Sequence, residues 1–156
     1  MTEETKFTEL ECHKKFAVDC FNYVWTLLEK AKRTADEDEE MVHAAHASRF
    51  HWARVGQPVN LARGDWQLSR VYAVLNLPRS ARRYAQRCLD ICEANDIGDF
   101  DLAYAYEALA RACAVAGSGK ECGEYLMLAE KVAVNIRGEE DRKLFYADLE
   151  TIPACE

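Results

Sequence analysis

Proline and glycine are scarce in this chain, with 3 and 7 among its 156 residues. An all-β sandwich needs many tight turns, so this scarcity argues against that class of fold. No run approaches the roughly 18 apolar residues of a membrane span, and residues 1–11 are acidic and lack the apolar stretch of a secretory signal. We therefore expect a helical, cytoplasmic protein with no membrane partner.

Motifs for catalysis and redox chemistry are also missing. The seven cysteines include no Cys-x-x-Cys pair, and there is no Gly-x-Ser-x-Gly nucleophile motif. The segment 117–120 (Gly-Ser-Gly-Lys) lacks the spacing of a phosphate-binding loop. We expect no catalytic residue and no cofactor, and a binding protein explains the chain better than an enzyme does.

The cysteines are placed like ordinary structural thiols. Cys88 and Cys92 lie four residues apart among apolar neighbours, which is typical of buried thiols. Their total is odd and no secretory signal is visible, so we expect no disulfide framework. Cys155, near the end of the chain, is expected to be the most exposed.

The net charge of −7 indicates that nucleic acid is not a partner. The charge is uneven, however, because residues 36–40 are all acidic and residues 79–87 include four arginines and no acid. We interpret these arginines as a solvated helix face. An alternative is a patch for an acidic partner, or for the acidic run of a second copy, which would make a homodimer.

Apolar residues recur at helical spacing along almost the whole chain. Thr8 and Glu11 have the pattern of a capping box, and a polar loop is expected at 35–38, before a helix with acids in its first turn. Pro58 and Pro78 suit the first turns of two later helices. The spacing predicts seven helices, at about residues 8–33, 39–56, 58–75, 78–94, 100–116, 121–136 and 139–149.

A shift of the sequence by 41 positions aligns similar residues, which indicates an internal repeat. The shift places Leu68 on Leu109 and Arg70 on Arg111. We therefore expect one domain, 1–156, that contains helical hairpins at about 13–56, 57–97 and 98–138 and a capping helix at 139–150.

These hairpins resemble the tetratricopeptide repeat (TPR), a helix-turn-helix motif of about 34 residues. The third hairpin carries the resemblance at Tyr106, Leu109, Ala110 and Cys113, and then at Cys122, Leu126 and Ala129. The chain departs from the motif because the usual first-helix glycine and closing proline are missing and the period is longer. The resemblance implies an all-α, right-handed superhelix of antiparallel helix hairpins that binds a protein or peptide partner.

A polar row on the third helix is the most unusual feature of the chain. Asn60, Arg63, Gln67 and Arg70 share one helix face, and Trp66 lies beside both arginines. In TPR-like stacks the first helix of each hairpin lines a groove, so Arg70 would point into it together with Arg111. Guanidinium groups bind carboxylates with two parallel hydrogen bonds. Two arginines in one groove therefore predict a binding site for an acidic peptide or a C-terminal carboxylate.

The alternative is that these arginines pair with Asp65, Glu107 or Asp101 on a solvated face. If the first two hairpins stack normally, Arg49, His51 and Trp52 of the second helix would border the same pocket as Arg63. The full predicted binding set is Arg49, His51, Trp52, Asn60, Arg63, Trp66, Gln67, Arg70 and Arg111.

The histidines of the second helix suggest a second hypothesis, a metal-dependent helical-bundle enzyme. His43 and His46 lie three residues apart and could share a metal with a residue of another helix, such as His13. A di-iron bundle needs a second Glu-x-x-His pair, which the chain lacks. The simpler interpretation is a polar helix face, so no metal is expected.

Overall fold

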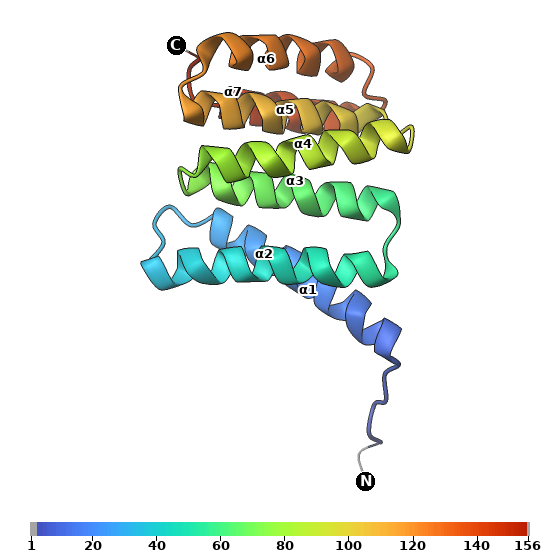
Figure 1. The fold of residues 1–156 in the computed structure, drawn as a ribbon. Coiled ribbons are helices and arrows are strands. Elements are labelled where there is room, and N and C mark those ends of the chain that lie inside the picture. The colour runs from blue at the N-terminus through green and yellow to red at the C-terminus, as the bar shows by residue number, and fades with distance from the viewer. Residues whose placement is uncertain (1–2, 156) are drawn as a thin grey trace. The chain divides into compact units, whose positions relative to one another are not determined.

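The computed structural model describes residues 3–155, and these residues form helices and connecting segments without any strand. The prediction of an all-α protein with seven helices is confirmed for this part of the chain. Helices α1 and α2, α3 and α4, and α5 and α6 pack as adjacent pairs (Figure 1). The helices are α1 (Glu9–Leu28), α2 (Ala35–Val55), α3 (Pro58–Val74), α4 (Pro78–Ala94), α5 (Asp99–Ala116), α6 (Gly119–Ala133) and α7 (Glu139–Glu150).

The helices fall into two compact units, Met1–Gln57 and Pro58–Glu156, here called unit 1 and unit 2. Unit 1 contains α1 and α2, and unit 2 contains α3 to α7. The single domain of three stacked hairpins therefore stays a prediction.

Capping boxes start both helices of unit 1. At α1, the Glu11 N–H donates to Thr8 Oγ1 at 3.2 Å and the Thr8 N–H donates to Glu11 Oε2 at 2.7 Å, as predicted. At α2, Thr34 and Glu37 make the same exchange at 3.1 and 3.3 Å. The predicted loop at 35–38 is therefore wrong, because this second box satisfies first-turn N–H groups and starts the helix earlier.

Helix α1 ends at Leu28, earlier than the predicted Arg33. The Leu27 carbonyl accepts from the Lys30 N–H at 3.2 Å and from Arg33 Nη1 at 3.3 Å, which turns the chain out of the helix. The remaining helix ends lie within about three residues of the predicted positions, which is the ordinary uncertainty of helix boundaries.

Small residues allow the two helices of unit 1 to approach closely. Ala17 on α1 and Ser48 on α2 are fully buried, and Ser48 Oγ donates to the Ala17 carbonyl at 2.8 Å. Val24 and Met41 are also completely inaccessible to solvent. Apolar contact and the buried hydrogen bond between Ser48 and Ala17 therefore hold the two helices together.

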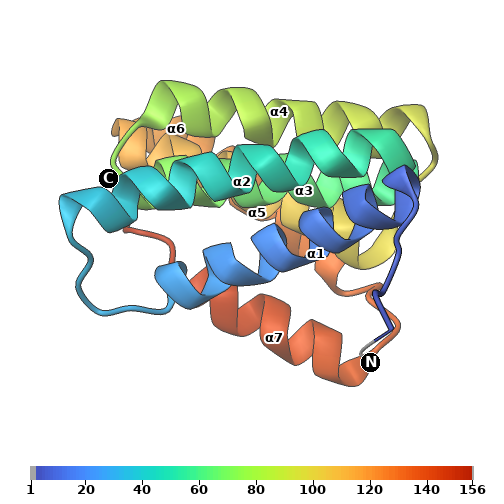
Figure 2. The same ribbon diagram turned by 90° about the horizontal axis from the view of Figure 1, so that it is seen from below.

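Helix α5 lies at the centre of unit 2, where it contacts α3, α4, α6 and α7. In Figure 2, α4 and α6 lie on one side of α5 and α7 lies on the other. Almost the whole segment 103–113 is buried, and alanines at many of its positions give four neighbouring helices room to approach. The sequence Ala-Tyr-Ala-Tyr-Glu-Ala-Leu-Ala-Arg-Ala-Cys thus predisposes α5 to be a central helix.

The 41-residue offset recurs in the spacing of the helices of unit 2. Pro58 and Asp99 begin α3 and α5, and Pro78 and Gly119 begin α4 and α6; both intervals are 41 residues. Within unit 2, the repeat seen in the sequence therefore corresponds to one antiparallel helix pair.

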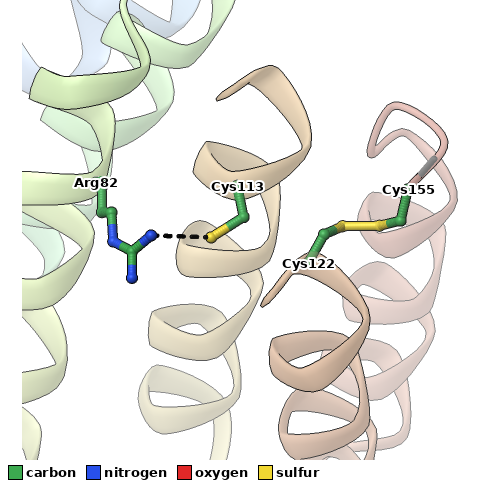
Figure 3. The surroundings of a disulfide bond; sticks show 4 residues. All are labelled: Arg82, Cys113, Cys122 and Cys155. Atoms are coloured by element: carbon green, nitrogen blue, oxygen red, sulfur yellow. Dashed lines mark hydrogen bonds between the residues drawn. A yellow bond between two sulfur atoms is a disulfide. The ribbon is translucent and has the colours of Figure 1, made fainter. Parts of the chain in front are cut away.

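A disulfide joins Cys122, at the start of α6, to Cys155, 33 residues later (Figure 3). This bond runs against the expectation of no disulfide framework, and Cys155 is half-buried rather than exposed. Helix α7 returns the chain along unit 2, so that two cysteines far apart in sequence meet. Cys88 and Cys92 are buried, as predicted.

No helix in residues 3–155 combines the length and the apolar character needed to cross a membrane.

Helix α7 is anchored by Phe145, whose side chain is fully buried and meets the Tyr104 ring edge-on at 4.9 Å. We expect Phe145→Ala to reduce the free energy of unfolding by about 3–5 kcal/mol, because a large aromatic side chain leaves a cavity. Urea unfolding followed by circular dichroism measures this loss. The neighbouring Leu144→Ala is the matched control, since Leu144 is mostly exposed and should change stability by less than about 0.5 kcal/mol.

Candidate functional site

Two arginines of the predicted polar row, and Trp66 beside them, are spaced along one face of α3 and contact α5. Arg63 Nε donates to Asp101 Oδ1 at 2.8 Å and its Nη2 donates to Oδ2 at 3.1 Å. One turn later the Trp66 ring meets the Tyr104 ring edge-on, with centroids 5.2 Å apart. The next turn brings Arg70 to Glu107 on α5. Successive turns of α3 therefore contact successive turns of α5, the equivalent helix of the next hairpin.

Two arginines converge on a single oxygen of Glu107. Arg70 Nη2 donates to Oε1 at 3.2 Å, and Arg111 donates to the same atom through Nε at 2.9 Å and Nη2 at 2.6 Å. We call these three residues the Glu107 cluster. The pair that the repeat aligned, Arg70 and Arg111, therefore does come together.

The surroundings of the Glu107 cluster differ from both sequence interpretations. The alternative pairing with Glu107 and Asp101 is present. The pairing with Glu107 is not on a solvated face, because the Glu107 side chain is 0% exposed, whereas Arg63 beside Asp101 is half-exposed. A carboxylate taken fully out of water needs paired charge and hydrogen bonds, and both arginines supply them.

Arg70 retains unused hydrogen-bonding capacity. Its Nε is buried and has no hydrogen-bond partner in the described part of the chain, and the same holds for Glu107 Oε2. The Arg70 side chain is 13% exposed, and its guanidinium carbon lies 5.6 Å from the centre of the Trp66 ring, within cation–π range. A guanidinium has five N–H donors, so this arginine has donors left for a further anionic ligand.

Arg111 is covered by the end of α7 and the residue that follows. Its Nη2 donates to the Asp148 carbonyl at 3.1 Å and to Thr151 Oγ1 at 2.7 Å, and Nη1 donates to the Thr151 carbonyl at 3.4 Å. The Arg111 side chain is only 9% exposed. Sequence reasoning missed these partners because they lie about 40 residues away.

Tyr104 joins the same region to α7. Its hydroxyl donates to Asp148 Oδ2 at 2.5 Å. Burial of the ring, followed by this hydrogen bond, raises the pKa of Tyr104 far above its usual range. The hydroxyl therefore stays protonated and acts as a fixed donor that holds the end of α7 against α5.

The remaining predicted residues are distributed over both units. On α3, Gln67 is buried and Asn60 is half-buried. Arg49, His51 and Trp52 are half-buried residues of unit 1. A pocket that they share with Arg63 stays a prediction.

The histidines form a pair that the sequence did not indicate. His13 on α1 and His51 on α2 place their Nδ1 atoms 2.8 Å apart, so one ring donates to the other. His43 is exposed and His46 is half-buried. Across residues 3–155, no group of three or more His, Cys, Asp or Glu side chains is arranged to hold a metal. His13, which the sequence suggested as a third metal ligand, therefore pairs with His51.

The arginines of α4 have separate partners. Arg82 Nη2 donates to Glu121 Oε2 at 2.5 Å, and Arg87 Nε lies 3.5 Å from the buried Asp65 Oδ2. Arg79 and Arg83 are exposed and line a surface hollow with Leu77. Helix α4 therefore exposes Arg79 and Arg83 to solvent, whereas its Arg82 and Arg87 pair with acidic residues of neighbouring helices.

Comparison of the chain with protein-family models, with curated proteins and with solved structures found no match.

Glu107 holds two arginines, so its charge matters to stability. We expect Glu107→Gln to reduce the free energy of unfolding by about 3–5 kcal/mol, because the arginines stay buried without their counter-charge. Asp101→Asn is the matched control at the other end of the row, where Arg63 is 50% exposed; it should cost at most about 1 kcal/mol. Equal losses in urea unfolding of the two variants would contradict this role for Glu107.

The histidine pair should make unit 1 sensitive to acid. Partial burial, and then the charge of His13, lower the pKa of His51 below its usual value. The unfolded chain binds this proton more readily, so the contribution is complete above pH about 6.5 and is lost as the pH falls below it. We expect His51→Gln to flatten the decrease in melting temperature between pH 7.5 and 5. His43→Gln, on the exposed face of the same helix, should leave that decrease unchanged.

Proposed function

We propose that unit 2 is a peptide-binding module of TPR-like type whose ligand is an acidic segment or a carboxylate. The observation that carries this proposal is the state of Arg70. It is a partly exposed guanidinium, held against Trp66, with a buried Nε that has no hydrogen-bond partner among the described residues.

The surroundings of Arg70 favour a carboxylate ligand. The planar guanidinium can offer two parallel N–H donors to one carboxylate, and a hydrogen bond between charged groups is stronger than a neutral one. Contact with the Trp66 ring and with Glu107 restricts the side chain before a ligand arrives. Less conformational entropy is then lost on binding.

Arg63 extends the proposed site along α3 by two turns. Its side chain is half-exposed, and its ion pair with Asp101 lies near the surface. An exposed pair of this kind contributes little to stability, so a ligand carboxylate can compete with Asp101 for the guanidinium. The spacing of Arg63 and Arg70 suits a short peptide with more than one acidic side chain.

The TPR-like architecture forms part of the same proposal. It is supported by antiparallel helix pairs, by contact between the first helices α3 and α5, and by the 41-residue interval between pairs. In a right-handed superhelix of this type the first helices would line a concave surface that includes Arg63 and Arg70. The metal-dependent alternative gains no support from the described side chains.

Fluorescence anisotropy tests the site directly. The probe is a labelled six-residue peptide of Asp and Glu with a free C-terminus, and the matched Asn and Gln peptide is the ligand control. We expect Arg70→Gln to weaken binding of the acidic peptide roughly tenfold or more, because a hydrogen bond to a charged group contributes about 1.5–3 kcal/mol.

Arg83→Gln is the matched protein control, since Arg83 is an exposed arginine on α4. It should bind the acidic peptide as the parent chain does. An equal loss in both variants would indicate general attraction to positive charge and would sink the proposed site. Circular dichroism of each variant verifies that helicity is intact.

A further inference from the structure

We propose that a surface hollow beside the first turns of α4 binds the phosphoryl group of a phosphomonoester. The hollow has a volume of about 700 Å³ and is lined by Leu77, Pro78, Arg79, Ser80 and Arg83. This volume lies within the range of roughly 300–1,000 Å³ that is typical of small-molecule sites. We call it the α4 hollow. It shares no residue with the Glu107 cluster, so it is a second site that goes beyond the proposed function.

The positive charge of the α4 hollow is not balanced by nearby carboxylates. Its lining contains two arginines and no acidic residue. Neither Arg79 nor Arg83 forms an ion pair within residues 3–155, whereas Arg82 and Arg87 of the same helix each pair with a carboxylate. Like charges four residues apart on a helix repel each other and destabilise it. A bound anion would therefore relieve a repulsion that the folded chain otherwise retains.

The two arginines are placed to act on one ligand. Arg79 and Arg83 are exposed and lie one turn apart on the same face of α4. The guanidinium carbon of Arg83 lies 5.7 Å from the centre of the Tyr84 ring, within cation–π range. That ring stacks on Tyr72 of α3, with centroids 5.7 Å apart and an angle of 10° between the rings. These contacts restrict Arg83 in advance, so less conformational entropy is lost on binding.

The other lining residues suit an organic phosphate better than a bare ion. Ser80 is half-buried, and its hydroxyl can donate a hydrogen bond to a phosphoryl oxygen. Leu77 is 48% exposed and, together with Pro78, offers apolar surface to the carbon of the ester. The Leu77 N–H donates to the Tyr72 carbonyl at 2.9 Å, which fixes this apolar surface to the end of α3. The α4 hollow therefore combines donors for the phosphoryl group with apolar contact for the rest of the molecule.

Charge favours a phosphomonoester over other anions at this site. A phosphomonoester carries a charge of about −1.5 to −2 at pH 7 and has three strong acceptor oxygens. It therefore balances both guanidinium groups, which bind phosphate oxygens in pairs. A carboxylate or a phosphodiester has one negative charge and would leave one arginine unbalanced. The net charge of −7 also opposes binding of a nucleic acid.

Calorimetric titration of the full chain at pH 7.5 tests the site with two phosphomonoesters. Glycerol phosphate represents a free small molecule, and a tripeptide with blocked ends and a central phosphoserine represents a phosphorylated protein. The same tripeptide with a central glutamate is the ligand control. We expect at least one ester to bind roughly tenfold or more tightly than the glutamate tripeptide, because the phosphoryl group brings a second charge and a third oxygen. The ester that binds more tightly identifies the source of the phosphoryl group.

Variants of the two arginines locate the binding. Arg79→Gln and Arg83→Gln should each weaken ester binding roughly tenfold, because each removes hydrogen bonds between charged groups. Arg137→Gln is the matched control, since Arg137 is a 95% exposed arginine of unit 2 outside the α4 hollow; it should bind the ester as the parent chain does. The ester should also raise the melting temperature of the parent chain, and this increase should be absent when both α4 arginines are replaced. Circular dichroism verifies that each variant is helical.

Four results would overturn the α4 hollow as a phosphomonoester site. The first is the absence of binding by both esters. The second is an equal loss in the Arg79, Arg83 and Arg137 variants, which would indicate general attraction to positive charge. The third is equal affinity for the phosphoserine and glutamate tripeptides. The fourth is a loss in Arg70→Gln without any loss in the α4 variants, which would place the ester at the Glu107 cluster.

Discussion

The buried carboxylate of Glu107 is the interaction on which the arrangement of unit 2 depends. It is fully removed from solvent, and one of its oxygens accepts hydrogen bonds from α3 through Arg70 and from its own helix through Arg111. Arg111 in turn bonds the end of α7. Removing any one of these groups would leave a charge in a site that cannot solvate it. Glu107 and Arg111 together thus link the three helices α3, α5 and α7.

The alanine-rich sequence of α5 makes this arrangement sterically feasible. Ala105, Ala108 and Ala112 are buried, and their small side chains leave room for neighbouring helices on several sides of α5. A helix surrounded in this way has little contact with water, so its Glu and Arg side chains must bond to each other or to neighbouring helices. The apolar packing and the Glu107 cluster are therefore two consequences of the same central position.

The sequence predicted the helices well because their signals are local. Pro58, Pro78 and the Thr8 box mark helix starts within a few residues of the observed positions. The prediction misses the start of α2, because it assigns residues 35–38 to a loop although Thr34 and Glu37 have the capping spacing. That signal was present in the sequence. The other misses, the disulfide of Cys122 with Cys155 and the contact of His13 with His51, depend on residues far apart in the chain.

The sequence by itself determined the helical class, the interval between helix pairs in unit 2 and the alignment of Arg70 with Arg111. These features follow from periodicity, caps and breaks, which act over a few residues, or from repetition of one unit. Only the tertiary structure decided that both arginines share Glu107 and that Thr151 covers one of them. The packing of α3 on α5 brings Arg70 to Glu107, and the return of α7 along α5 places Thr151 on Arg111. Neither is encoded in any short stretch of sequence.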